Sequence, residues 1–226
     1  MKRHQKIGFL GGTFDPVHRG HLRLAAVAEA VCGLDRIYFV LARHPWHKGA
    51  RCAPFRDRFA MLALALRGRP RWQPLAIPDP ARPTLDPECS PASSYSIDEV
   101  RWLQQRHPAA TIVYVLGADA FHDLPTWKQY RRLLAACDFA VAPRAGYSLR
   151  GLAERLPAAL NPRLGRGRIY LGARTVHWLE AFRDSASSTA ARAAFSGGGA
   201  APRVPPAVAE YARRAGLYST DKDQTR

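Results

Sequence analysis

The chain has 226 residues, 47% of them hydrophobic and 10% aromatic, a composition that excludes a wholly disordered or fibrous protein. A formal net charge of +16 attracts polyanions such as nucleotides, nucleic acid or anionic lipid without deciding among them. No apolar run reaches the ~20 residues of a membrane span, and the four cysteines are scattered without a CxxC pair. These features predict a cytoplasmic protein with reduced thiols rather than a zinc site.

Short β-branched or aromatic runs alternate with longer helical segments along most of the chain. Strands are predicted at residues 6–10, 36–41, 72–77, 111–116, 139–141 and 168–171. Helices are predicted at residues 20–31 (closed by Gly33), 55–66, 96–105 (opened by a Ser96-x-x-Glu99 capping box), 188–195 and 204–215. The alternation predicts an α/β fold, a Rossmann-like doubly wound parallel sheet over residues 1–183. A small helical part at 184–218 and a flexible tail at 219–226 complete the expected organisation.

Residues suited to chemistry gather where the first strand meets the first helix, in the segment Gly11-Gly12-Thr13-Phe14-Asp15-Pro16-Val17-His18-Arg19-Gly20-His21. Glycines after a parallel strand let the backbone approach a ligand and point its amides at an anion. His18 and His21 are three residues apart at the positive end of the helix, so both rings can lie on one face.

Three interpretations of this segment compete. Ordinary loop-to-helix punctuation explains the glycines and Pro16 but leaves the paired histidines unexplained. A metal site on His18, His21 and Asp15 lacks an HExxH pattern. A nucleotide-phosphate site accounts for strand, glycines, helix start and both histidines together, and it is neither a Walker A loop nor a GxGxxG fingerprint.

The segment closely resembles the HxGH signature of the nucleotidyltransferase superfamily, and the whole string is similar to that of bacterial nicotinate-nucleotide adenylyltransferases. Further segments resemble motifs of that family in the family's order: Pro45-Trp46-His47-Lys48 (PPHK), Ser94-Tyr95-Ser96-Ile97-Asp98 (SYTxxT), Gly117-Ala118-Asp119 (GxD), Pro125-Thr126-Trp127 (PTW), Ser187-Ser188-Thr189-Ala190-Ala191-Arg192 (SSTxIR) and Gly216-Leu217-Tyr218 (the usual ending). Trp46 replaces the second proline, Ser96 replaces threonine, and Ala186 stands where the family has the isoleucine of ISSTxIR.

The resemblance implies adenylyl transfer from ATP to nicotinate mononucleotide, giving deamido-NAD and pyrophosphate. It implies catalytic roles for His18, His21 and Arg192. ATP would be bound by Gly11, Gly12, Thr13, Phe14, His18, His21, Lys48, Gly117, Asp119, Ser188, Thr189 and Arg192. Nicotinate mononucleotide would be bound by Tyr95, Ser96, Trp127 and His47. Mg²⁺ would enter with the phosphates of ATP rather than in a dedicated site on the protein.

Structural alternatives accompany several of these residues. Ser188-Thr189 would cap a helix in any globular protein, and Asp119 would serve as an N-cap. Tyr95 and Trp127 would be ordinary core aromatics.

The expected partners are therefore ATP and nicotinate mononucleotide, with neither nucleic acid nor membrane, while monomer and homo-oligomer stay equally open. A second function in the same superfamily is another adenylyl- or cytidylyltransferase, such as the phosphopantetheine enzyme, which the PTW, SYS and GLY segments disfavour. A nucleic-acid-binding module would suit the charge. The basic residues are dispersed, however, and no HTH, RRM or zinc-finger pattern is present.

Overall fold

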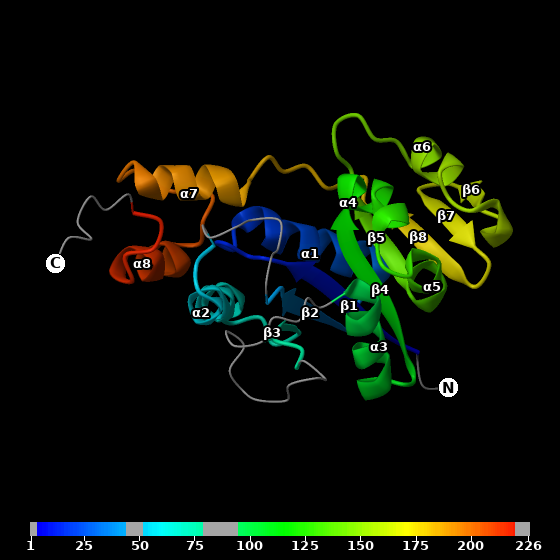
Figure 1. Ribbon diagram of the computed structural model, residues 1–226, viewed down its shortest axis with the longest axis horizontal. Coiled ribbons are helices and arrows are strands. Elements are labelled where there is room, and N and C mark those ends of the chain that lie inside the picture. The colour runs from blue at the N-terminus through cyan, green and yellow to red at the C-terminus, as the bar shows by residue number, and fades with distance from the viewer. Residues whose placement is uncertain (1–3, 44–51, 79–94, 220–226) are drawn as a thin grey trace.

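One sheet runs through the described residues 4–43, 52–78 and 95–219 of the computed structural model. Within these residues it has eight strands in the order β3-β2-β1-β4-β5-β8-β7-β6 (Figure 1). The strands are β1 (Gln5–Gly12), β2 (Arg36–Leu41), β3 (Trp72–Leu75), β4 (Ala110–Gly117), β5 (Asp138–Ala142), β6 (Arg163–Gly165), β7 (Arg168–Leu171) and β8 (Arg174–Trp178). The helices are α1 (Arg19–Cys32), α2 (Phe55–Leu66), α3 (Ser96–Arg106), α4 (Ala118–His122), α5 (Tyr130–Ala136), α6 (Leu149–Glu154), α7 (Ser188–Ser196) and α8 (Pro206–Arg214), with short 3-10 turns η3 (Leu124–Thr126) and η4 (Ala158–Leu160).

The predicted doubly wound parallel sheet is confirmed for β3, β2, β1, β4, β5 and β8, which are consecutive in the sheet and all pair in parallel. The prediction is wrong at one edge, because β7 pairs antiparallel with β8 and β6 antiparallel with β7. Only residues 172–173 separate β7 from β8, and so short a connection can join only antiparallel strands. Strands β6 and β8 were not predicted from the sequence; each begins with an arginine, exposed at Arg163 and half-buried at Arg174.

The local signal for a helix end holds at α1 and fails at α3. Gly33 ends α1 in the left-handed conformation with φ of 64°, as its position after the helical pattern predicts. The capping box at Ser96 is wrong, because Tyr95 is the N-cap residue and Ser96 is already helical. The Ser96 hydroxyl instead lies 3.0 Å from the hydroxyl of Tyr114 on β4. The Ser96 side chain, which the local sequence assigns to the helix end, is therefore paired with the buried Tyr114 phenol instead.

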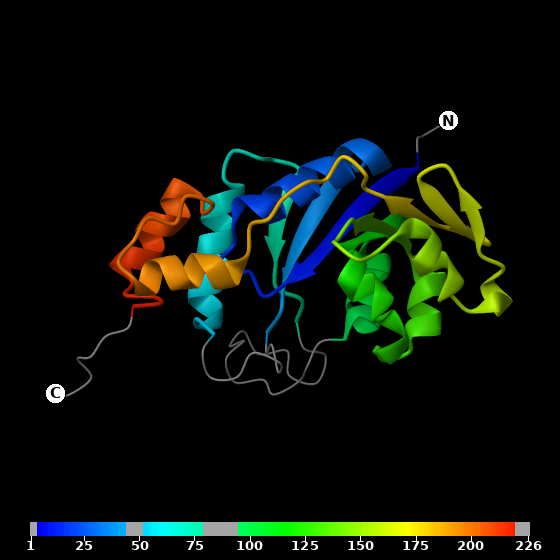
Figure 2. The same cartoon turned by 90° about the horizontal axis from the view of Figure 1, so that it is seen from above.

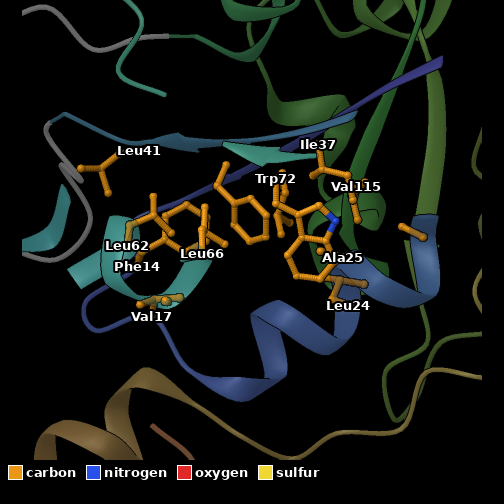
Figure 3. Packing of buried hydrophobic residues seen from close by; sticks show 14 of the residues in the cluster. Phe14, Val17, Leu24, Ala25, Ile37, Leu41, Leu62, Leu66, Trp72 and Val115 are labelled. Atoms are coloured by element: carbon orange, nitrogen blue, oxygen red, sulfur yellow. The ribbon is translucent and has the colours of Figure 1, made fainter. Parts of the chain in front are cut away.

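Two apolar layers cover the sheet, because successive strand residues point to opposite faces. Leu10, Phe39 and Val115 belong to the cluster beneath α1, α2, α7 and α8, part of which Figure 3 shows around Trp72. Phe9 and Tyr114 belong to the cluster beneath α3, α4, α5 and α6. Figure 2 shows α1 on one side of the sheet and these four helices on the other. Each fully buried large side chain contributes roughly 1.5–3 kcal/mol.

The strand order places a topological switch between β1 and β4. From β1 the chain proceeds outward through β2 to β3, whereas from β4 it proceeds in the opposite direction through β5 to β8. Loops that follow the carboxyl ends of two such strands diverge and leave a crevice that binds ligands. The topology therefore predicts a ligand-binding crevice beyond Gly12 and Gly117, the last residues of β1 and β4.

The C-terminal helices α7 and α8 lie together at one end of the molecule, close to α2 (Figure 1). The Tyr211 hydroxyl of α8 donates a 2.8 Å hydrogen bond to Asp57 Oδ1 of α2. The division of the chain at residue 184 stays a prediction, and the expected flexible tail falls almost wholly outside the described residues. None of the described helices is long and apolar enough to cross a membrane.

Candidate active site

The loop between β1 and α1 brings two imidazole rings into contact. His18 is the N-cap residue of α1 and is 6% exposed. Its ring stacks on that of His21 with centroids 3.7 Å apart and planes inclined by 25°. The backbone N–H of His18 donates a 3.2 Å hydrogen bond to Nδ1 of His21. Two imidazoles thus stand together at the positive end of a 14-residue helix, where anions bind.

Residues that precede the histidines in the chain pack against them. Phe14 is 1% exposed, and its ring meets His21 edge-on with centroids 5.0 Å apart. Its side chain is therefore part of the core, and only its backbone is available to a ligand. Gly11, Gly12 and Thr13 are half-buried along the same loop.

The serine–threonine motif of α7 packs directly against this loop, although about 170 residues separate the two along the chain. The Ser188 hydroxyl donates to the carbonyl oxygen of Pro16 at 3.1 Å. Arg192 donates from Nη1 to the carbonyl oxygen of Asp15 at 2.8 Å and from Nη2 to Thr189 Oγ1 at 3.3 Å. The alternative that Ser188 or Thr189 caps α7 is wrong, because the preceding residue, Ser187, is the N-cap and accepts from the backbone N–H of Ala190.

The end of β4 supplies an exposed carboxylate on the other side of the crevice. Asp119 lies in the first turn of α4, whose N-cap is Gly117, so Asp119 does not cap the helix. The Asp119 carboxylate is 3.9 Å from Nε of Arg144. Any Cβ at position 117 would collide with this carboxylate, so glycine is required there for Asp119 to keep its place. Arg144 also lines an open hollow of about 480 Å³ that extends to Trp178 and Asp184.

Two of the predicted pyridine-binding residues, Ser96 and Trp127, lie beside a side chain that sequence reasoning missed. Tyr114 lies 3.0 Å from Ser96 through their hydroxyls, and its ring centroid is 6.2 Å from that of Trp127. Burial raises the pKa of Tyr114, which keeps the phenol protonated at neutral pH. Tyr95 is 43% exposed, and Lys128 Nζ lies 4.0 Å from its ring centroid. Tyr114 looks like a core strand residue in the sequence, so nothing local distinguishes it.

Two predicted ligand-binding residues, His47 and Lys48, fall outside the described residues. Among the residues that are described, no three His, Cys, Asp or Glu side chains are grouped as metal ligands.

A buried arginine that sequence reasoning also missed fastens the loops of the site. Arg58 is 2% exposed, and its guanidinium donates to the carbonyl oxygens of Thr13, Ala42, Arg43 and Ala53 at 2.8–3.1 Å. It thereby joins the loops after β1 and β2, and its burial lowers its pKa. Its signal was present, because residue 58 shares a helical face with the apolar residues 55, 62 and 65.

A second arginine, Arg43, joins the loop after β2 to the segment after β3. Arg43 donates from Nε and Nη2 to the carbonyl oxygen of Ile77 at 3.0 and 2.7 Å. The segments that follow β1, β2 and β3 are therefore tied together at the carboxyl edge of the sheet by two guanidinium groups.

The loop, the switch-point crevice and the fold together define a nucleotidyltransferase. A family model described as Cytidylyltransferase-like matches residues 9–194. Proteins named "Probable nicotinate-nucleotide adenylyltransferase" from Pelobacter propionicus and Neisseria meningitidis serogroup B are 33% and 34% identical to the chain, over 95% of its length and 98% of theirs. The chain belongs to the nicotinate-nucleotide adenylyltransferase family within the cytidylyltransferase-like proteins.

Solved structures agree on the fold. Plasmodium falciparum nicotinic acid mononucleotide adenylyltransferase, complexed with APC in one structure and with NaAD in another, matches with TM-scores of 0.70 and 0.69. The sequence identities are 16% and 17%, and the matches cover 95% of this chain and 98% of those chains.

Proposed function

We propose that this site joins ATP and nicotinate mononucleotide to give deamido-NAD and pyrophosphate, the reaction named for the relatives of the chain. The phosphate of the mononucleotide attacks the α-phosphorus of ATP, the bond to the bridging oxygen of the β-phosphate breaks, and pyrophosphate leaves. The protein supplies no nucleophile. It aligns the two phosphates in line and stabilises the negative charge that develops between them.

The observation that carries the proposal is the hydrogen bond from the His18 N–H to His21 Nδ1. Because Nδ1 accepts this bond, a neutral His21 ring has its proton on Nε2 and presents a donor there. The partner ring of His18 stacks on it at the start of α1. The pair is proposed to donate hydrogen bonds to the α- and β-phosphate oxygens, with amides of Gly11, Gly12 and Thr13 and the backbone of Phe14 nearby.

The start of α7 is proposed as the second anion site for the triphosphate. Ser188, Thr189 and Arg192 gather where the helix dipole is positive and beside the first loop. Lys48 and His47, which lie outside the described residues, are proposed to add positive charge, Lys48 toward ATP and His47 toward the mononucleotide.

The adenosine of ATP is proposed to occupy the far side of the crevice. Asp119 and Gly117 lie where the ribose hydroxyls would follow from the phosphates, because a carboxylate at the end of a parallel strand is suited to hold them. The adjoining hollow of about 480 Å³ is large enough for a purine and is lined by Arg144, Trp178 and Phe182.

The pyridine ring is proposed to bind among Tyr95, Ser96 and Trp127, against the Tyr114 phenol. Stacking on Trp127 would contribute about 0.5–1.5 kcal/mol. Backbone N–H groups around these residues would donate hydrogen bonds to the carboxylate of nicotinate, and they would face the NH₂ of nicotinamide donor to donor.

Magnesium is proposed to enter already bound to the triphosphate, where it neutralises phosphate charge. The loop between β1 and α1, called here the phosphate loop, offers imidazoles, and the start of α7 offers hydroxyls and a guanidinium, groups that suit phosphate oxygens. The proposal places the reaction in the cytoplasm, with the two nucleotides as small-molecule partners.

Pyrophosphate release tests the proposal with ATP and a panel of nicotinate mononucleotide, nicotinamide mononucleotide and phosphopantetheine. We expect kcat/KM for the acid to exceed that for the amide by at least ~30-fold, equivalent to roughly 2 kcal/mol of charge-assisted hydrogen bonding. Equal efficiency with the acid and the amide would contradict the pyridine pocket alone. Turnover of phosphopantetheine in place of both mononucleotides would contradict the function itself.

A further inference from the structure

The carboxylate of Asp15 is buried where the phosphate loop meets the C-terminal helices. The residue is 1% exposed. Its Oδ1 accepts a 2.7 Å hydrogen bond from the hydroxyl of Tyr218 and a 3.2 Å hydrogen bond from the backbone N–H of Ala53. Within the described part of the chain its Oδ2 accepts no hydrogen bond and lies 3.7 Å from Nη1 of Arg192. A buried carboxylate needs such partners, because leaving it uncompensated is costly.

Arg58 is another cation near Asp15 among the described residues, and its charge attracts the carboxylate while most of its N–H groups are used elsewhere. Its Nε, Nη1 and Nη2 all donate to backbone carbonyl oxygens. Among the described side chains, Tyr218 donates its hydroxyl to Oδ1 of Asp15 and Arg192 approaches Oδ2 from the other side.

Arg192 can interact either with Asp15 or with a bound phosphate. Its Nη1 donates to the backbone carbonyl of Asp15 and its Nη2 to Thr189, while a quarter of its side chain remains exposed. A shift of Nη1 toward Oδ2 would turn the present ion pair at 3.7 Å into a shorter, hydrogen-bonded one. The guanidinium would then be engaged by the protein and less available to a phosphate.

Tyr218 is held firmly as the competing donor. Its ring stacks on Phe195 of α7 with centroids 5.7 Å apart, and its carbonyl oxygen accepts a 2.7 Å hydrogen bond from the Ser196 hydroxyl. Burial and the hydrogen bond to Asp15 raise the pKa of the phenol, so the hydroxyl keeps its proton and donates at neutral pH.

We propose that Tyr218 and Asp15 form a positioning pair for Arg192. The Tyr218 hydroxyl satisfies the Asp15 carboxylate and so keeps Arg192 available to the phosphates of ATP. The final segment of the described chain thereby tunes a phosphate-binding cation from about 200 residues beyond the phosphate loop. The inference rests on the proposed role of Arg192 in the anion site.

The test compares Tyr218→Phe with Tyr211→Phe. Both substitutions remove a tyrosine-to-aspartate hydrogen bond of nearly equal length from the C-terminal helical part, but only Tyr218 touches Asp15. We expect Tyr218→Phe to weaken ATP binding, measured by calorimetry, and kcat/KM for ATP by about tenfold or more, the scale of a lost charge-assisted bond. KM for nicotinate mononucleotide should stay within about twofold. Tyr211→Phe should leave both nucleotide constants unchanged.

A second substitution tests whether the negative charge of Asp15 causes the effect of losing the Tyr218 hydroxyl. If the unsatisfied carboxylate captures Arg192, adding Asp15→Asn to Tyr218→Phe should restore most of the lost ATP affinity, because the neutral amide attracts the guanidinium far less. Further loss in the double variant, or equal losses in Tyr218→Phe and Tyr211→Phe, would overturn the proposal. A wild-type protein that binds ATP without transferring its adenylyl group to nicotinate mononucleotide would contradict the proposed function. The comparison of ATP binding between the variants would still test the positioning pair.

Discussion

Replacing Arg58 with methionine removes the charged group that holds the phosphate loop to its neighbours while nearly preserving side-chain volume. The guanidinium donates to four backbone carbonyl oxygens. A hydrogen bond from a charged donor contributes about 1.5–3 kcal/mol, and an orphaned buried carbonyl costs about 1–3 kcal/mol. Relief of the desolvation cost of the charge offsets part of this sum. We therefore expect a loss of about 3–5 kcal/mol from a total stability of typically 5–15 kcal/mol.

Urea unfolding followed by tryptophan fluorescence measures this loss. The control is Arg56→Met, because Arg56 is on the same helix but exposed, and such surface substitutions change stability by about 0.5 kcal/mol or less. Arg58→Lys should resemble Arg58→Met, since an ammonium cannot reach the four carbonyls from one position. A loss below about 1 kcal/mol for Arg58→Met, with an unchanged slope of free energy against urea, would refute the idea that this residue fastens the loops.

Two further substitutions probe the histidines. His21→Ala should lower kcat by at least ~100-fold, the scale of one lost preorganised donor, with an unchanged circular dichroism spectrum; near-wild-type turnover in the folded variant would remove His21 from the chemistry. Burial, with Arg168 and Lys6 nearby, lowers the pKa of His177 to about 4, whereas an unfolded histidine titrates near 6.5. Below about pH 6.5 the unfolded state therefore binds a proton at His177 that the native state does not bind. The free energy of unfolding should then fall by on the order of 3 kcal/mol as the pH is lowered toward 4. Urea midpoints should show a steeper decline for the wild type than for His177→Gln between pH 7 and pH 5, and parallel declines would argue against a buried neutral His177.

The sequence by itself determined the parts of this protein whose signals are local. Apolar periodicity marked β2 and α2 at their observed bounds, because burial on one face of a helix or both faces of a strand is written into neighbouring residues. The glycines and histidines where β1 meets α1 likewise predict a phosphate site, since the strand, the turn and the helix start are consecutive, and this site stays a prediction. The resemblance of ordered motifs then indicated the family.

Tertiary structure alone decided which distant groups meet. The contact of Arg192 with the loop carbonyl of Asp15, and that of Tyr218 with the Asp15 carboxylate, join residues 177 and 203 positions apart. The buried Tyr114 phenol took the Ser96 hydroxyl that the local pattern assigned to a helix cap. No spacing rule anticipates such pairs, because they form only when the sheet order has brought the carboxyl ends of β1 and β4 together. A buried polar group then takes its partner from whichever element packs against it.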